Sequence, residues 1–235
     1  MRKLIASLMI TTAFGTFAHA GEDGSLTVVE LFTSEGCSSC PPADEMLTEL
    51  AQHDDILALA LHVDYWDYLG WKDDYAKAKF TKRQETYNSI LPSRYRLVTP
   101  QMVFNGRSQV AGAKGASIEG ELQKMSKQAD SVSLTIEKNA SAFSVDVDPS
   151  DVNVGRADVF LIQYMPEIVS KIKAGENRGK TLKHTNIVTS WEKIGDWNGQ
   201  ADWTVSQPFL EDGVEGAIIV QAADNGPILA ARKLR

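Results

Sequence analysis

The sequence predicts an α/β fold in its first half, followed by a mainly-β sandwich in its second half. Strand-like and helix-like segments alternate before residue 130, which is typical of a parallel sheet covered by helices. From Val132 onward, short runs of alternating apolar and polar residues replace this pattern, as expected for a β-sandwich. The chain's two cysteines, Cys37 and Cys40, stand between the first strand-like and the first helix-like segment.

The elements of the first half follow from local patterns. Residues 26–32 and 55–63 are apolar runs that predict buried strands, and Pro41 and Pro42 mark the first turn of a helix over residues 42–53. Together they form a βαβ unit. A mostly helical insertion over residues 73–90 follows. Asn105-Gly106 then predicts a hairpin between residues 98–104 and 108–112, and a helix over residues 117–128 ends this part.

The second half reads as seven short strands. Turn signals such as Asp224-Asn225-Gly226-Pro227 separate some of them. The predicted strands cover residues 132–137, 142–147, 157–165, 180–194, 203–207, 217–221 and 228–231.

The change of pattern and the start of the chain predict a signal peptide and two domains. Arg2 and Lys3 precede an uncharged stretch that ends on Ala18-His19-Ala20, which matches an export signal over residues 1–20. Residues 21–130 and 131–235 would be the two domains. We therefore expect the mature chain in the periplasm or secreted, without a membrane span after signal cleavage.

The composition limits the expected partners. The formal net charge of −7 argues against nucleic acid and anionic membrane surfaces, which attract clustered positive charge. An exported chain with a single Cys-x-x-Cys is not a disulfide scaffold, so we expect the two thiols to be functional groups of the protein. We expect periplasmic or secreted thiol proteins as partners. The sequence does not indicate an oligomeric state.

The spacing of Cys37 and Cys40 predicts dithiol redox chemistry. A thiol at a helix N-terminus is next to unpaired N–H groups and the positive end of the helix dipole, so its pKa can fall from about 8.5 to roughly 3.5–7.5. Cys37 is predicted to face solvent as the reactive thiolate, and Cys40 to lie within the first helical turn. No cofactor is expected beyond this redox-active disulfide.

Three alternatives use the same cysteines. A structural disulfide would close so short a loop that it would stabilise the fold little. A soft-metal site would need His53 or His62 to complete it, because the chain has no second Cys-x-x-Cys, and no metal ligand is predicted. A cysteine hydrolase would need a remote base such as His184, and a resolving cysteine so near would interrupt its acyl chemistry.

Several motifs carry a resemblance to a known family, and they lie at residues 30–42, 62–71, 83–84, 99–101 and 175–177. Over residues 28–197 the chain resembles an exported bacterial family with a thioredoxin-like fold, known as domain of unknown function 1223. The resemblance implies a thioredoxin-like first domain in which the Thr99-Pro100 bond is cis. Pro100 would then pack against the disulfide, and the Thr99 backbone would bind a substrate peptide.

Other residues are assigned by position. Glu30 is the charged residue in the first strand, and burial would make it a proton acceptor for Cys40, although the corresponding thioredoxin acid lies one position later. The alternative is that Glu30 faces solvent and has no such role. The predicted substrate-binding residues are Ser34, Glu35, Tyr65, Trp66 and Gln101. The aromatic ones either form the floor of a groove or pack the insertion onto the sheet.

The expected function is a periplasmic thiol-disulfide oxidoreductase, in which Cys37 attacks a protein disulfide and Cys40 resolves the mixed disulfide. We favour a reductase or an isomerase. The alternative is a thioredoxin-fold binding module for a protein partner or a soft metal, with cysteines that do not react.

Overall fold

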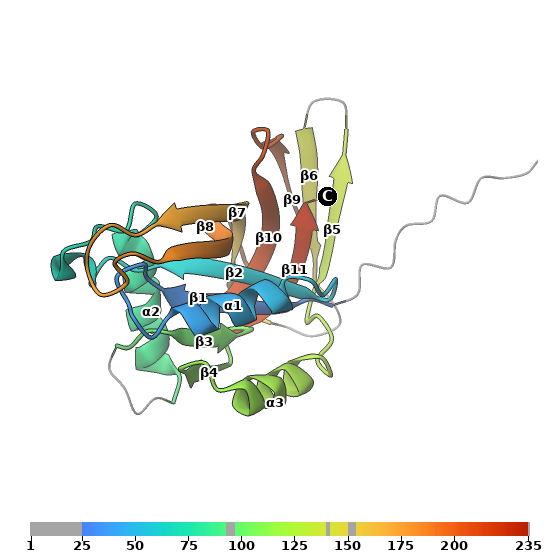
Figure 1. Cartoon of the computed structure of the whole chain (residues 1–235). Helices are drawn as coiled ribbons and strands as arrows, with labels where there is room; N and C mark the ends of the chain where they lie inside the picture. The colour runs from blue at the N-terminus through green and yellow to red at the C-terminus, as the bar shows by residue number, and fades with distance from the viewer. Residues whose placement is uncertain (1–24, 93–96, 140–141, 150–153, 235) are drawn as a thin grey trace, which may run out of the picture.

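The computed structural model describes residues 25–92, 97–139, 142–149 and 154–234 (Figure 1). Its first elements are β1 (Thr27–Thr33), α1 (Pro41–Leu50) and β2 (Ile56–His62). β1 and β2 pair in parallel, with Thr27 opposite Ile56 and Thr33 opposite His62. The predicted βαβ unit is therefore confirmed. It places the Cys37-to-Cys40 turn at the carboxyl end of β1.

The helical insertion is shorter than predicted. A 3-10 turn, η1 (Asp67–Leu69), comes first, and α2 (Ala78–Ile90) starts only at Ala78. The predicted hairpin is confirmed as β3 (Gln101–Phe104) and β4 (Ser108–Ala111), which pair antiparallel around Asn105 and Gly106. Both turn residues have positive φ, which explains the Asn-Gly pair. α3 (Gly115–Met125) follows.

The strands of the second half divide between two sheets. β5 (Ser133–Lys138), β6 (Ala142–Asp148) and β9 (Trp203–Pro208) form a three-stranded sheet in the order β5-β6-β9. The others join the first-half strands in one eight-stranded mixed sheet of order β11-β10-β7-β8-β2-β1-β3-β4. The added strands are β7 (Ala157–Lys171), β8 (Thr181–Trp197), β10 (Glu215–Ala222) and β11 (Ile228–Leu234).

One sheet thus crosses the boundary predicted near residue 130, through the pairing of β2 with β8. The fold is a mixed α/β fold with one large mixed sheet and three α-helices among the described residues. The division into two domains stays a prediction. The predicted signal peptide lies outside the described residues. Within those residues, no helix is long and apolar enough to span a membrane.

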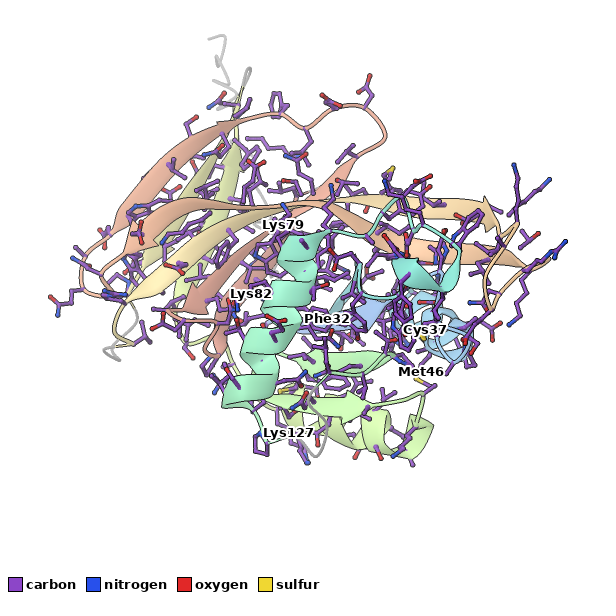
Figure 2. The ribbon with its side chains drawn as sticks, turned by 90° about the vertical axis from the view of Figure 1, so that its left-hand side faces the viewer. Phe32, Cys37, Met46, Lys79, Lys82 and Lys127 are labelled. Carbon is purple, nitrogen blue, oxygen red and sulfur yellow. A yellow bond between two sulfur atoms is a disulfide. The ribbon has the colours of Figure 1, made fainter. Side chains whose placement is uncertain are left out.

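Side chains alternate between the two faces of the sheet, and each face has its own apolar core. Val28 and Phe32 of β1 pack with Phe80 and Tyr87 of α2 on one face. Val29 and Leu31 of β1 pack with α1 and α3 on the other face. Figure 2 shows α2, marked by Lys79 and Lys82, crossing in front of Phe32. The cysteine-bearing helix α1 therefore covers the face opposite α2.

The third core lies where the three-stranded sheet packs on the end of the large sheet formed by β7, β10 and β11. It joins Phe143, Val145 and Val147 of β6 to Val159 of β7 and Val220 of β10. These β6 residues alternate with less buried neighbours, as the sequence pattern predicts.

β7 and β8 continue as a two-stranded ribbon beyond their neighbour β10. β10 pairs with β7 only up to Tyr164, whereas β7 and β8 stay paired as far as Lys171 and Thr181. The loop that joins the two strands, residues 172–180, reaches the turn that carries the cysteines, because Asn177 in this loop bonds to the carbonyl of Cys37.

Candidate functional site

Cys37 and Cys40 form a disulfide at the N-terminus of α1, with a Cα separation of 5.4 Å. Cys40 is the N-cap residue and already has a helical backbone, and the helix begins at Pro41. The N–H of Cys40 donates to the carbonyl of Cys37 at 3.2 Å, which closes the turn. The predicted position of the pair on a strand-to-helix turn is confirmed.

Both sulfurs are nearly enclosed in this oxidised form. Cys37 is 2% exposed and Cys40 is 0% exposed, so the expectation that Cys37 faces solvent is wrong for the disulfide state. The exposed part of the turn is Ser38 and Ser39. The hydroxyl of Ser39 lies 3.4 Å from the sulfur of Cys37. An attacking partner must therefore approach across these two serines.

The segment around Pro100 lies against this turn. The Thr99-Pro100 bond is cis, as predicted. The hydroxyl of Ser39 donates to the carbonyl of Thr99 at 3.4 Å, and the indole N–H of Trp66 donates to the hydroxyl of Thr99 at 2.7 Å. Gly36 lies so close to Trp66 that an added Cβ would be 3.1 Å from the Trp66 Cβ. Thr99, Trp66 and the disulfide turn therefore form one surface.

The other predicted substrate-binding residues are set back from that surface. Gln101 is 1% exposed, and its side-chain amide is used by hydrogen bonds with Gln84, Asn88 and Gln109. Ser34 is buried and accepts a hydrogen bond from the N–H of Gly36. The Ser34 contact lies beside the disulfide turn, whereas those of Gln101 join β3 to α2 and β4. A direct role in substrate binding stays a prediction for both residues.

Tyr65 is partly buried beside Trp66, with the two ring centroids 5.7 Å apart. Burial raises the pKa of the Tyr65 hydroxyl to about 12, so this group is neutral at physiological pH. The aromatic ring also packs against the core on the α2 face of the sheet. The structure therefore combines the two interpretations, since Trp66 contacts the site and both rings pack against the core.

Glu30 is fully buried on the α2 face of the sheet. Its carboxylate accepts hydrogen bonds from Arg83 Nε at 2.5 Å, from Arg83 Nη2 at 2.9 Å and from the Tyr87 hydroxyl at 2.7 Å. The pKa of Arg83 is lowered by burial, but the neighbouring Glu30 more than offsets this and holds it above its ordinary value. The predicted role of Glu30 as proton acceptor for Cys40 stays a prediction.

A second set of buried ionisable groups lies on the α1 face, and the sequence interpretation did not assemble it. We call it the acid–histidine cluster: Glu35, Asp44, His62, Asp73 and His184. Each of the five is at most 6% exposed. His62 Nδ1 lies 2.7 Å from Asp73 Oδ2, and His184 Nε2 lies 3.4 Å from Glu35 Oε1. The rings of His62 and His184 meet edge to face, with centroids 5.0 Å apart.

The pKa shifts in the cluster follow from burial and from these pairs. Burial lowers the pKa of His62, but Asp73 outweighs it and the net shift is upward. Burial raises the pKa of Asp73, and His62 reverses this to a net decrease. Burial also raises the pKa of Glu35, yet its contacts with His184, Ser170 and Trp71 bring it below its ordinary value. Glu35 thus stays ionised, directed toward His184 and Trp71.

Asp44 differs from the other acids in the cluster. Burial raises its pKa to about 6, despite the nearby His184 and His62 and a hydrogen bond from Thr33. The Thr33 hydroxyl donates to Asp44 Oδ1 at 2.8 Å. Asp44 lies one helical turn after Cys40, in the first turn of α1. The sequence signal that could have identified Asp44 as a site residue is its position on the buried side of the predicted helix.

The loop between β7 and β8 holds the disulfide turn from outside. Asn177 is 1% exposed, and its amide donates to the carbonyls of Glu35 at 2.8 Å and Cys37 at 3.0 Å. Gly175 has a positive φ and lies so close to Trp71 that an added Cβ would be 3.0 Å from the Trp71 Cβ. The sequence analysis named residues 175–177 only as part of the family resemblance. The described contacts of this loop show that it also holds the disulfide turn.

Within the described part of the chain, no group of three or more His, Cys, Asp and Glu side chains is arranged to hold a metal ion. The soft-metal alternative is not tested by this finding. His62, which that alternative invoked, has its Nδ1 occupied by Asp73. The arrangement offers a disulfide for exchange, and the buried acids and histidines near it can bind and release protons.

One of the comparisons with known proteins identifies a family, and its description assigns no function. A family profile described as "Protein of unknown function (DUF1223)" matches residues 28–221. A crystal structure of a protein from Agrobacterium tumefaciens is similar, with 32% identity, a TM-score of 0.76, and coverage of 91% of this chain and 96% of that chain. A search of curated proteins found no match.

A second solved structure, HBP35 of Porphyromonas gingivalis, is more distant. It is 14% identical with a TM-score of 0.59, and the alignment covers 91% of this chain and 76% of that chain. At this identity the likeness concerns the fold alone.

Proposed function

The chain belongs to the DUF1223 family, whose description assigns no function, and we propose from its own residues that it is a thiol-disulfide oxidoreductase acting on protein disulfides. The observation that carries the proposal is the Cys37–Cys40 disulfide at a helix N-terminus, with the cis Thr99-Pro100 segment against it. A helix N-terminus stabilises a thiolate, and a thiolate is the attacking species in disulfide exchange.

We propose that residues 21–130 form a thioredoxin-like domain and that the second half is a sandwich-like domain. The parallel βαβ unit, the disulfide on its strand-to-helix turn and the cis-proline beside it support the first assignment. The shared core between the three-stranded sheet and β7, β10 and β11 supports the second assignment. The predicted export signal and the disulfide together support an oxidising compartment such as the periplasm.

In the proposed reaction, reduced Cys37 attacks a partner disulfide and forms a mixed disulfide. Cys40 then attacks Cys37 and releases the partner as a thiol, which leaves the bond now seen between Cys37 and Cys40. Thr99 and Trp66 are the residues best situated to contact the partner, since both lie against the turn. Trp66 is only partly buried, so it keeps surface for contact.

One observation favours a second candidate, a binding module with a structural disulfide. Cys37 and Cys40 are 2% and 0% exposed, and a buried disulfide reacts slowly. In that case the surface of Trp66 and Thr99 would bind a protein partner without exchange. The same experiment separates the two candidates.

The test is mixed-disulfide trapping with the full chain. In the Cys40→Ala variant the resolving thiol is absent, so a partner attacked by Cys37 should remain covalently bound. We expect discrete adducts with exported proteins that disappear on reduction. Identifying them would give the substrate.

The control is the Cys37→Ala variant, which keeps one thiol of the same turn but lacks the proposed nucleophile. It should form no adducts. Equal adducts from both variants would show unselective thiol chemistry. A complete lack of adducts from Cys40→Ala, with non-covalent capture of the same partners by both variants, would establish the binding module instead.

A further inference from the structure

We propose that Asp44 accepts the proton of Cys40 when Cys40 resolves the mixed disulfide, and that Glu30 does not. This inference rests on the proposed oxidoreductase function. It assigns a proton acceptor on helix α1 in place of the one on strand β1 that the sequence suggested. Four observations lead to it: the face of the sheet, the contacts of Glu30, the position of Asp44 and the groups around Asp44.

The face of the sheet separates Glu30 from the cysteines. Side chains alternate along β1, so Glu30 lies with Val28 and Phe32 on the side of α2. Val29 and Leu31 lie with α1 on the opposite side. A shift of one residue along a strand moves a side chain to the other face. The carboxylate of Glu30 is therefore across the sheet from the helix that begins after Cys40.

The contacts of Glu30 also leave it unsuited to take a proton. Both of its oxygens accept hydrogen bonds from Arg83, and Arg83 is only 7% exposed. Protonation of Glu30 would leave the guanidinium of Arg83 as a buried charge without its counter-ion, which is strongly unfavourable. Glu30 therefore has a structural role.

Asp44 lies on the correct side and at short range. Cys40 already has helical backbone angles as the N-cap of α1, and the N–H of Asp44 donates to its carbonyl at 3.1 Å. Residues four apart on a helix share a face, with about 5–6 Å between their Cβ atoms. Both side chains are buried, so this shared face is the inner one. A carboxylate one helical turn away on the same buried face is placed to take the thiol proton, directly or through one water molecule, and this placement is the basis of the proposal.

The surrounding groups keep Asp44 responsive to proton transfer. His62 of β2 and His184 of β8 favour its charged form, while burial and the neighbouring Asp73 oppose it. The resulting pKa of about 6 lies near physiological pH, where a general base is most effective. Glu35, the remaining acid of the acid–histidine cluster, is held by His184 and Trp71.

The proposed step balances atoms and electrons. The Cys40 thiol gives its proton to the carboxylate of Asp44, and the resulting thiolate attacks the sulfur of Cys37. The bond between Cys37 and the partner sulfur breaks, and its electron pair leaves on the partner as a thiolate. The Cys37–Cys40 disulfide forms, so the protein is oxidised and the partner is reduced. Asp44 then returns the proton to solvent or to the partner thiolate.

The test measures resolution separately from the first attack. The reduced full chain is mixed with an aromatic disulfide, dithiobis-nitrobenzoate, which releases a coloured thiol at each step. The first release depends on the reagent concentration and reports Cys37. The second release is independent of concentration and reports Cys40 attacking the mixed disulfide.

In the native chain, the rate of the second release should increase with pH around a midpoint near 6, the pKa of Asp44. Asp44→Asn keeps the shape and can still accept the bond from Thr33, so the turn should persist. It should lose this midpoint and slow the second release about 100-fold near neutral pH, because general-base assistance contributes roughly that much or more. Its rate should recover at high pH, where Cys40 ionises unaided.

Two further variants sharpen the test. Thr33→Val removes the hydrogen bond that lowers the pKa of Asp44, so its midpoint should move to higher pH, a change that a merely structural role would not produce. Glu45→Gln removes an exposed acid of the same helix and should behave as the native chain does.

The outcomes separate the two proposals. If Asp44→Asn has the native pH profile while both releases occur, the role of Asp44 is wrong and the oxidoreductase function stands. If the native chain shows the first release but no second one, Cys40 does not resolve mixed disulfides, and both proposals fail.

Discussion

Asn177 donates a hydrogen bond from its side-chain amide to the main-chain carbonyl of Cys37, although 140 residues separate the two in the sequence. The same amide donates to the carbonyl of Glu35 at 2.8 Å. Asn177 lies in the loop that joins β7 to β8, and this ribbon belongs to the second half of the chain. The backbone of the disulfide turn is therefore fixed by a segment from outside the α/β half.

The first prediction concerns this contact. Asn177→Ala should lower the free energy of unfolding by about 1–3 kcal/mol, because two buried carbonyls lose their donor. Urea denaturation of the oxidised chain would measure it. Arg178→Ala is the matched control, since Arg178 is exposed in the same loop and its removal should change stability by less than about 0.5 kcal/mol. Equal losses in both variants would show that the amide does not stabilise the turn.

The second prediction concerns the Glu30–Arg83 ion pair. Arg83→Met should destabilise the fold by about 3–5 kcal/mol, because it leaves the Glu30 carboxylate buried without its counter-ion. Adding Glu30→Gln to this variant should recover a large part of the loss, since the uncompensated charge is then removed. Denaturation midpoints at one pH would give the comparison.

Lys82 provides the control for that pair. It lies next to Arg83 on α2, but its ion pair with Glu85 is solvent-exposed, at 78% and 48% of the two side chains. Lys82→Met should therefore change stability by at most about 1 kcal/mol. A loss from Lys82→Met as large as that from Arg83→Met would contradict the importance of burial.

The first-half elements could be predicted from the sequence because their signals are local. The prolines at residues 41 and 42 mark the start of α1, and the helix begins at Pro41. The apolar runs of β1 and β2 are fully buried, so they stand out without an alternating pattern. Asn105 and Gly106 specify the β3–β4 turn through their positive φ.

β7 is longer than predicted because its outer part, beyond residue 165, contains no buried residue, whereas β8 begins at Thr181, next to the predicted start at residue 180. Beyond the last β10 pair, residues such as Glu167 and Lys183 are exposed and form an ion pair across the ribbon. Backbone hydrogen bonds continue there although the apolar pattern has ended. A prediction from hydrophobic periodicity ends the strand where the core ends.

The acid–histidine cluster could not be predicted for a different reason. Its members come from β2, β8, α1 and two loops, and only the order of strands in the sheet brings His62 and His184 together. No local pattern contains that order. The side of the sheet on which Glu30 lies could not be predicted for the same reason. Alternation along a strand assigns its side chains to two faces, but it does not show which helix covers each face.

The third prediction concerns stability and pH at Asp44. Its folded-state pKa of about 6 lies above the ordinary value of 3.8, so the folded chain binds this proton more tightly than the unfolded chain does. Stability should therefore decrease as pH rises between these two values, by on the order of 3 kcal/mol in total. Asp44→Asn should be more stable than the native chain near pH 7 and equally stable below about pH 4. Urea denaturation at both pH values would check it.

The fourth prediction concerns His62 and Asp73. The pKa of His62 is raised in the folded chain. The pair therefore stabilises the fold fully at pH values below 6.5, the pKa of His62 in the unfolded chain, and this contribution is lost as pH rises through the pKa of His62 in the folded chain. Asp73→Asn should lower the pKa of His62, because it removes the charge that opposes the effect of burial. Proton NMR titration of the His62 ring would measure the shift. An unchanged His62 titration would show that Asp73 does not hold its charge.

The fifth prediction concerns the two thiols after reduction. Cys37 precedes the N-terminus of α1, whose dipole favours a thiolate, and the Ser39 hydroxyl lies 3.4 Å from its sulfur. Cys40 is fully buried beside the acid Asp44, and both burial and a nearby negative charge oppose its ionisation.

Pulse alkylation across pH should therefore label Cys37 with a midpoint below about 8.5 and Cys40 only at higher pH. Ser39→Ala should raise the Cys37 midpoint by about half a unit to one unit, since one hydrogen bond to the thiolate is lost. Ser38→Ala, in the exposed part of the same turn, is the control and should leave it unchanged. Equal labelling of both thiols near the ordinary value would mean that the helix N-terminus does not activate Cys37, and the nucleophile would then have to be reassigned.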